Sequence, residues 1–108
     1  MAETFTNDKR GATRYPLIAS AEVTEVESGA TFSVRTSDIS RTGCYLDMLN
    51  PSPKGAQLRV TITKGGEVFE ATARVAFTVP GLGMGIAFLR VSPQHENVLS
   101  KWLAEIAV

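Results

Sequence analysis

Apolar and polar residues alternate along most of this chain, and an alternation with a period of two predicts β-strands. The clearest run covers residues 68–79, where one face would carry Phe69, Ala71, Ala73, Val75, Phe77 and Val79. Shorter runs with the same alternation cover residues 17–26, 31–39, 44–48, 58–63 and 84–91. The pattern therefore predicts six strands, each with one face turned toward an apolar core.

Segments rich in glycine, proline and small polar residues separate these runs. Residues 27–30 and 50–55 have the composition of turns and loops, and Gly65-Gly66 can supply the two positive φ angles of a tight hairpin. Gly83 and Gly85 lie at the start of the last run. Glycines at such positions indicate a bend or a close approach of another group to the backbone.

Residues 93–107 follow the period of a helix instead. Ser92 is a suitable N-cap and Pro93 a suitable first helical residue. Five apolar residues then fall on one stripe of the helix, namely Val98, Leu99, Trp102, Leu103 and Ile106. We expect this stripe to cover the core, with a partner-binding face as the minor alternative. Six short strands followed by one helix predict an all-β barrel or sandwich with a C-terminal α-helix.

The composition is that of one small globular domain without a dominant charge. The chain has 108 residues, of which 44% are hydrophobic and 20% charged, and its 11 basic and 11 acidic residues give a net charge of zero. This balance argues against a large basic surface for duplex DNA or an anionic membrane. The densest cationic cluster is formed by Lys9, Arg10 and Arg14.

Cysteine and histidine are too few for a disulfide or a zinc site. Cys44 is the only cysteine and His95 the only histidine, so we expect Cys44 to be a small buried apolar residue. The N-terminal residues lack the basic and apolar regions of a signal peptide, and no apolar run approaches the ~20 residues of a membrane span. We therefore expect a cytoplasmic protein without membrane insertion.

The stretch Asp38–Gly43 carries the most informative polar residues. It interrupts two strand-like runs with Asp-Ile-Ser-Arg-Thr-Gly, a composition typical of a turn. In an extended chain Asp38 and Ser40 would point to the same face, and Gly43 could adopt a positive φ or let another group approach. Taken alone, this stretch indicates a polar hairpin turn capped by the aspartate or serine side chain.

A second polar motif lies upstream, where Arg10 and Arg14 stand four residues apart. Gly11 and Pro16 argue against a stable helix there, so an arm or loop is expected to present both guanidinium groups. The two motifs, in this order, resemble the PilZ family, whose signature is R-x-x-x-R followed by [D/N]-x-S-x-x-G. The resemblance extends from about Lys9 to the C-terminal helix. It implies a six-stranded antiparallel β-barrel that binds the bacterial second messenger cyclic di-GMP.

The resemblance also implies a role for each motif residue. Arg10 and Arg14 would bind the ligand from a flexible arm, residues 1–14, while Asp38, Ser40 and Gly43 would form the ligand-facing surface of a barrel at residues 15–108. Asp38 would accept hydrogen bonds from guanine, Ser40 would add a hydroxyl contact, and Gly43 would leave room for the base. Lys9 occupies the position before the first arginine, which influences ligand stoichiometry in the family, and a cation there would favour an intercalated ligand dimer.

The residues contain no plausible Ser/His/Asp or Cys/His set for catalysis. We therefore interpret the protein as a receptor that needs no cofactor and acts through a separate effector protein. A PilZ-like barrel used only for protein interaction is one alternative, although the intact arginines argue against it. A barrel for single-stranded nucleic acid is another, but it would need a basic groove with exposed aromatic residues, and the net charge is zero.

Overall fold

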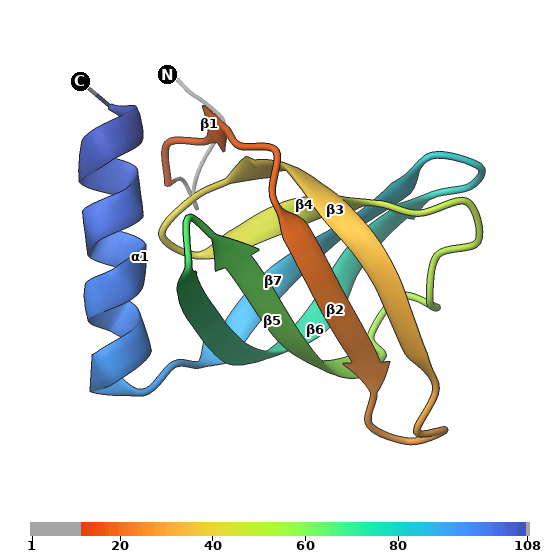
Figure 1. Ribbon diagram of the computed structural model, residues 1–108. Coiled ribbons are helices and arrows are strands. Elements are labelled where there is room, and N and C mark those ends of the chain that lie inside the picture. Colours follow the sequence, from red (N-terminus) through yellow and green to blue (C-terminus); the bar gives the residue numbers. More distant parts are fainter. Residues whose placement is uncertain (1–11, 108) are drawn as a thin grey trace.

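Seven strands and one helix follow one another through residues 12–107, the part of the chain that the computed structural model describes. The strands are β1 (Tyr15–Pro16), β2 (Ser20–Glu25), β3 (Thr31–Ile39), β4 (Gly43–Asp47), β5 (Gln57–Lys64), β6 (Glu67–Val79) and β7 (Gly83–Arg90). The helix is α1 (Pro93–Ile106), which stands beside the strands in Figure 1.

Six of these strands close into an antiparallel barrel. The hydrogen-bonded order is β3-β2-β5-β6-β7-β4, and an additional pairing between β3 and β4 joins the two ends. The two-residue strand β1 pairs with the end of β3 beside the barrel. The predicted six-stranded barrel with a C-terminal helix is thus confirmed.

The inward faces of the strands form the core, as the alternation predicted. Leu17, Ala19, Ala21 and Val23 are all buried, and so are Leu58, Val60 and Ile62 of β5. Gly65 and Gly66 both adopt positive φ, at 58° and 81°, in the hairpin between β5 and β6. The first predicted strand is shorter than expected, because residues 17–19 form an irregular link between β1 and β2.

Helix α1 covers the core with its apolar stripe. Ser92 is the N-cap and Pro93 follows it directly. Leu99, Trp102 and Leu103 are buried, and the Trp102 ring centroid lies 6.3 Å from that of Phe69 in β6. The expected N-cap and core-covering stripe are therefore confirmed.

One prediction about β6 is wrong. Phe77 was expected to share the buried face of Val75, but its side chain lies on the outer surface and the residue is 41% exposed. The pairing with β7 shifts between Val75 and Phe77, because Ala76 is an extra residue at a β-bulge. A one-residue shift turns every following side chain to the opposite face.

Candidate functional site

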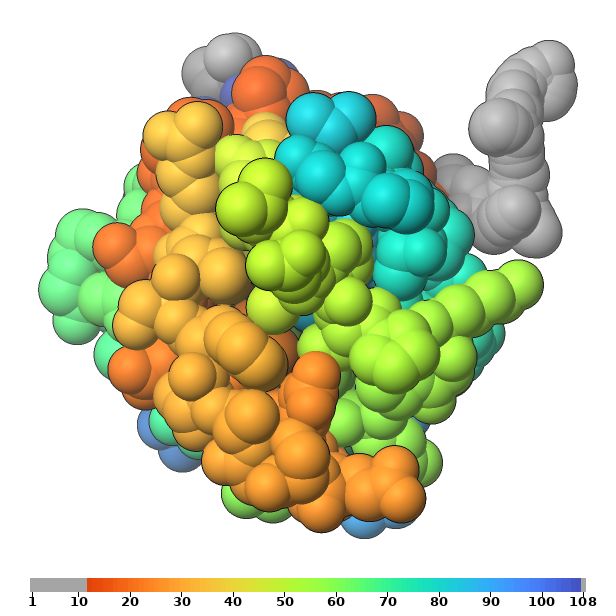
Figure 2. Space-filling model, turned by 90° about the vertical axis from the view of Figure 1, so that its right-hand side faces the viewer, coloured from red at the N-terminus to blue at the C-terminus, as the bar shows by residue number. Residues whose placement is uncertain are grey.

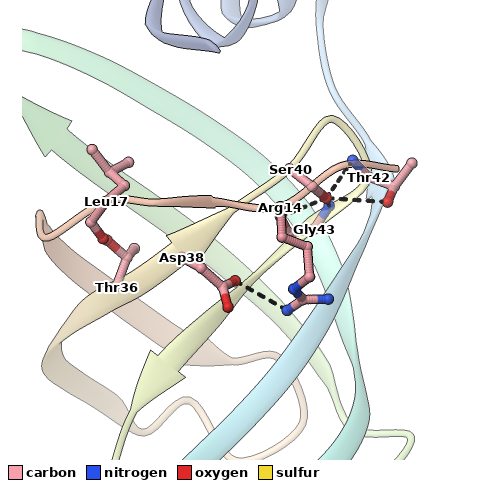
Figure 3. Close-up of polar contacts among 7 residues, drawn as sticks. All are labelled: Arg14, Leu17, Thr36, Asp38, Ser40, Thr42 and Gly43. Atoms are coloured by element: carbon pink, nitrogen blue, oxygen red, sulfur yellow. Dashed lines mark hydrogen bonds and ion pairs between the residues drawn. The ribbon is translucent and has the colours of Figure 1, made fainter. Parts of the chain in front are cut away.

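The polar motifs identified in the sequence lie at the junction of β1, β3 and β4. Arg14 immediately precedes β1, Asp38 lies near the end of β3, and Ser40 and Gly43 form the turn into β4. Lys9 and Arg10 lie outside the described residues. Figure 3 shows the four described motif residues together.

Arg14 and Asp38 form an ion pair although 24 positions separate them in the sequence. The distance from Arg14 Nη2 to Asp38 Oδ1 is 3.0 Å, and the two side chains are 50% and 31% exposed. Strand β1 brings them together, because Tyr15 pairs with Ile39 and Pro16 with Asp38. The structure thus joins the second arginine of R-x-x-x-R to the aspartate of D-x-S-x-x-G on the outside of the barrel.

A β-bulge in β3 determines which way Asp38 points. Thr36 pairs with Leu46 and Asp38 with Tyr45, so Ser37 is the extra residue between them. Thr36 is fully buried, and in a regular strand Asp38 would share its inward face. The bulge turns the carboxylate outward instead, toward Arg14.

Ser40 is buried, at 2% exposure, and its hydroxyl group is used within the turn. Its Oγ accepts hydrogen bonds from the amides of Thr42 at 3.1 Å and Gly43 at 3.2 Å. The same hydroxyl lies 3.2 Å from the Gly43 carbonyl oxygen, to which it can donate. Ser40 follows the last residue of β3, so the extended geometry that would have placed it beside Asp38 does not hold. Its contacts make Ser40 a residue that shapes the turn.

Gly43 is required by the packing of β4 against β7. A Cβ atom at this position would collide with the carbonyl oxygen of Ile86 and would crowd Ala87. Gly43 does not adopt a positive φ, so the close approach of a neighbouring backbone is the reason for glycine here. That neighbour belongs to the barrel itself.

The turn also contacts helix α1. Arg41 Nη1 donates a hydrogen bond of 3.2 Å to the Ser100 hydroxyl group. The turn that follows Asp38 is therefore connected directly to the element that covers the core.

The cysteine beside the site is a buried, unreactive thiol. Cys44 is 1% exposed, and burial, with a smaller contribution from the nearby Asp38 carboxylate, raises the pKa of its thiol far above the usual value. The expectation of a buried apolar cysteine is confirmed. Within residues 12–107, His, Cys, Asp and Glu side chains form no cluster suited to a metal ion. Over the same residues no helix has the length and apolar character needed to cross a membrane.

The outer surface at this junction offers a carboxylate, a guanidinium group and an aromatic ring. Tyr45 lies directly opposite Asp38 on β4 and is partly exposed. A carboxylate can accept from the paired N–H donors of a guanine edge, while arginine binds phosphate or stacks on a purine. The arrangement therefore suits an anionic, purine-containing ligand.

Comparison with known proteins gives one family. The sequence matches the model of the PilZ domain over residues 8–105. No curated protein sequence matches the chain.

Several solved structures share the fold. The PilZ domain of CeSA from a cellulose-synthesizing bacterium is 19% identical with a TM-score of 0.70, covering 90% of this chain and 100% of that chain. The PilZ domain of YcgR from Escherichia coli, solved with c-di-GMP, is 18% identical with a TM-score of 0.73, covering 92% of each chain. Apo MrkH of K. pneumonia is 15% identical with a TM-score of 0.72, and the match covers 97% of this chain but 53% of MrkH.

Proposed function

The chain belongs to the PilZ domain family, and we propose that it is a receptor for cyclic di-GMP that passes the signal to a separate protein. The observation that carries this proposal is the meeting of Arg14 and Asp38 on the outer surface, 3.0 Å apart. Two motifs from distant parts of the sequence supply complementary recognition groups at one place. The YcgR domain with the same fold was solved with c-di-GMP, which supports the choice of ligand.

The ligand carries two phosphates and two guanines, and the motif residues can divide this work. Asp38 accepts from the N1–H and N2–H₂ groups of one guanine, and Arg14 donates to a phosphate or to guanine O6 and N7. Arg10 and Lys9 add cations from the N-terminal arm, residues 1–14, to the barrel formed by residues 15–108. Ser40 and Gly43 contribute by holding the turn and the β4–β7 pairing that present Asp38.

Binding requires an exchange of partners at the site. Arg14 and Asp38 neutralise each other in the structure, so the carboxylate must leave the guanidinium group to meet a guanine edge. A phosphate then replaces the carboxylate as the partner of Arg14. Both groups remain satisfied only if base and phosphate arrive together, which favours a nucleotide over a simple anion.

We expect the protein to act in the bacterial cytoplasm as a receptor without catalytic activity or cofactor. Its signal passes to an effector protein. The turn at Asp38–Gly43 and helix α1 are joined by the Arg41–Ser100 hydrogen bond. A ligand-induced movement of the turn would therefore alter a contact with the helix. That contact favours α1 and its surroundings as the surface from which the effector reads the signal.

Calorimetric titration tests the proposal. The protein should bind cyclic di-GMP, with little or no binding of GTP, and it should discriminate against cyclic di-AMP. Adenine lacks the N1–H and N2–H₂ pair, so Asp38 would lose its partner at a cost of about 1–3 kcal/mol. A stoichiometry of two ligands per chain would support the role of Lys9 in an intercalated dimer. Absence of cyclic di-GMP binding would contradict the proposal.

A second candidate function is protein interaction without nucleotide. Three large apolar residues, Leu49, Phe77 and Leu82, are 72%, 41% and 65% exposed. The Gly81 amide donates to the Leu49 carbonyl oxygen at 3.2 Å, so the loop after β4 adjoins the β6–β7 hairpin, as Figure 2 shows on the face turned away from α1. An intact fold that binds none of the three nucleotides in the titration would favour this second candidate.

A further inference from the structure

Thr36 holds a buried hydroxyl group next to the site. The residue is fully buried, whereas most polar residues of the described chain are at least partly exposed. Its Oγ1 accepts a hydrogen bond of 3.1 Å from the Ala19 amide and donates one of 2.5 Å to the Leu17 carbonyl oxygen. The hydroxyl thus binds both ends of the link between β1 and β2.

The link is irregular, so the backbone N–H and C=O groups of residues 17–19 cannot all pair in a regular strand ladder. Pro16 pairs with Asp38 and Ser20 with Arg35, so residues 17–19 lie opposite only residues 36–37. Two backbone bonds bridge this stretch, from Leu17 N to Ser37 O at 3.1 Å and from Thr36 N to Ala19 O at 2.9 Å. The remaining amide of Ala19 and carbonyl of Leu17 are satisfied by the Thr36 side chain.

Arg14 and Asp38, the two charged residues of the candidate site, lie on the two segments that the Thr36 hydroxyl connects. Arg14 lies three residues before Leu17, and Asp38 lies two residues after Thr36, directly beyond the bulge at Ser37. Figure 3 shows Thr36 and Leu17 to the left of the Arg14–Asp38 pair. A displacement of residues 17–19 relative to β3 would carry β1, and with it Arg14, away from the carboxylate.

We propose that Thr36 is a positioning residue of the nucleotide site. Its hydroxyl fixes the link of residues 17–19 against β3, and this sets the placement of Arg14 relative to Asp38. The inference rests on the proposed binding of cyclic di-GMP for its affinity readout, but the Arg14–Asp38 pair also exists without ligand and provides an independent readout.

Thr36→Val tests the role, because it removes the hydroxyl group while preserving the branched shape. We expect affinity for cyclic di-GMP to fall about tenfold, within the share that one charged hydrogen bond contributes. Thr36→Ser keeps the hydroxyl and should restore affinity to within about twofold of the parent. The matched control is Thr24→Val. Within residues 12–107 the Thr24 hydroxyl bonds only to that of Thr31, at 3.1 Å on the exposed β2–β3 surface, so the affinity of this variant should equal that of the parent.

A double-mutant cycle separates positioning from general stability. If Thr36 acts through Arg14, Thr36→Val should cost much less affinity in an Arg14→Ala background than in the parent. Equal costs in both backgrounds, or parental affinity in a folded Thr36→Val, would overturn the proposal. Should Thr36→Val fail to fold, hydrogen exchange of the Ala19 amide in the parental protein tests the role instead. Ligand should slow this exchange by reciprocal coupling. An unchanged exchange rate would contradict the role of Thr36.

NMR without ligand keeps this test separate from the proposed function. The Arg14 Nη–H signals come from the group that bonds to Asp38 Oδ1. They should report the ion pair in the parent and in Thr36→Ser, and should move toward the position of a free arginine in Thr36→Val. If the parent binds no cyclic di-GMP but the signal still moves, the receptor proposal fails while the positioning role stands. An Arg14 signal identical in all three proteins would overturn the positioning role.

Discussion

Single residues of one short motif have different tasks in this protein. Asp38 is turned to the surface and meets Arg14 at 3.0 Å. Ser40, two residues later, is buried and holds the amides of Thr42 and Gly43. The motif D-x-S-x-x-G therefore combines one surface carboxylate, the proposed recognition group, with two residues that stabilise the turn and the strand pairing beside it. Substitutions at Asp38 should affect binding, and those at Ser40 or Gly43 should affect stability as well.

Arg14 should matter for ligand and hardly for the fold. Its pair with Asp38 is partly exposed, and ion pairs at the surface stabilise a protein by only about 0.2–1 kcal/mol. A charged hydrogen bond to the ligand is worth about 1.5–3 kcal/mol. Arg14→Ala should therefore weaken cyclic di-GMP binding about tenfold to a hundredfold and leave the melting temperature nearly unchanged.

Arg35 provides a matched control for this prediction. Its Nε lies 2.9 Å from Asp47 Oδ2, and the two side chains are 64% and 34% exposed, much like the Arg14–Asp38 pair. Arg35→Ala should reduce the stability of the fold as slightly as Arg14→Ala does, and should retain the parental affinity for cyclic di-GMP. Calorimetry and thermal melting of both variants decide the matter, and equal losses of affinity would show that general electrostatics, not the site, binds the ligand.

Among the secondary-structure elements, helix α1 is attached to the β5–β6 hairpin by two carboxylates, Glu67 of β6 and Glu105 of α1, whose Oε1 lies 3.9 Å from Lys64 Nζ. Glu67 Oε2 lies 2.9 Å from Lys101 Nζ, and Glu67 Oε1 accepts from the Trp102 indole at 3.2 Å. The Lys101 ammonium group is the main cause of a lowered pKa at Glu67. The helix is joined to the β3–β4 turn on another side through Arg41 and Ser100.

The lowered pKa of Glu67 makes the attachment of α1 sensitive to acid. A carboxyl group whose pKa is lower in the folded state stabilises the fold above its ordinary pKa of 4.5, and this stabilisation is lost as the pH falls through the lowered value. Glu67→Gln should therefore lower the melting temperature at pH 7 and have less effect in strong acid. Fluorescence of Trp102, the only tryptophan, provides the melting signal.

Glu70→Gln is the control for the acid experiment. Glu70 lies on the outer face of β6, and no ion pair involves it among residues 12–107. Its replacement should leave both the melting temperature and the acid dependence unchanged. If Glu67→Gln shows the parental profile from pH 7 downward, the carboxylate does not fasten the helix.

The sequence predicted these elements well because alternation and capping are local properties. Ser92, Pro93 and the apolar stripe of α1 needed no tertiary information. The positions of the two β-bulges did require tertiary information. Nothing in the pattern around Ser37 or Ala76 distinguishes an extra residue from a regular one, since the register shift depends on the partner strand. This is why the outward turn of Phe77 was missed, and why the motif residues could be identified while the support provided by Thr36 could not.

For the whole molecule, closure of the barrel depends on β4, which pairs with β3 on one side and β7 on the other. Both pairings, the β3–β4 seam and the β4–β7 seam, run past the candidate site. Asp38 faces Tyr45 across the first, and Gly43 faces Ala87 across the second. The proposed recognition surface and the closure of the barrel therefore involve the same residues. Loss of binding in a β4 variant has to be separated from loss of the barrel.

Two glycines in these strands test how strict the closure is. Alanine at Gly43 would place Cβ against the Ile86 carbonyl oxygen, a backbone atom in the β4–β7 seam that can move only if the strands separate. Alanine at Gly85 would instead meet the ring of Phe77, which is 41% exposed and can rotate into solvent. Neither glycine has a positive φ, so backbone strain does not distinguish them.

Gly43→Ala should consequently be the more destabilising of the two substitutions. Overpacking that cannot relax costs about 1–3 kcal/mol, and Gly85→Ala should cost less because a side chain gives way. Urea denaturation measures both free energies of unfolding, and amide exchange of β4 shows whether the seam has opened. If Gly85→Ala proved the more destabilising, packing of Phe77 on the outer surface would matter more to the fold than the β4–β7 seam, and the stability of the barrel would have to be assigned to that aromatic contact.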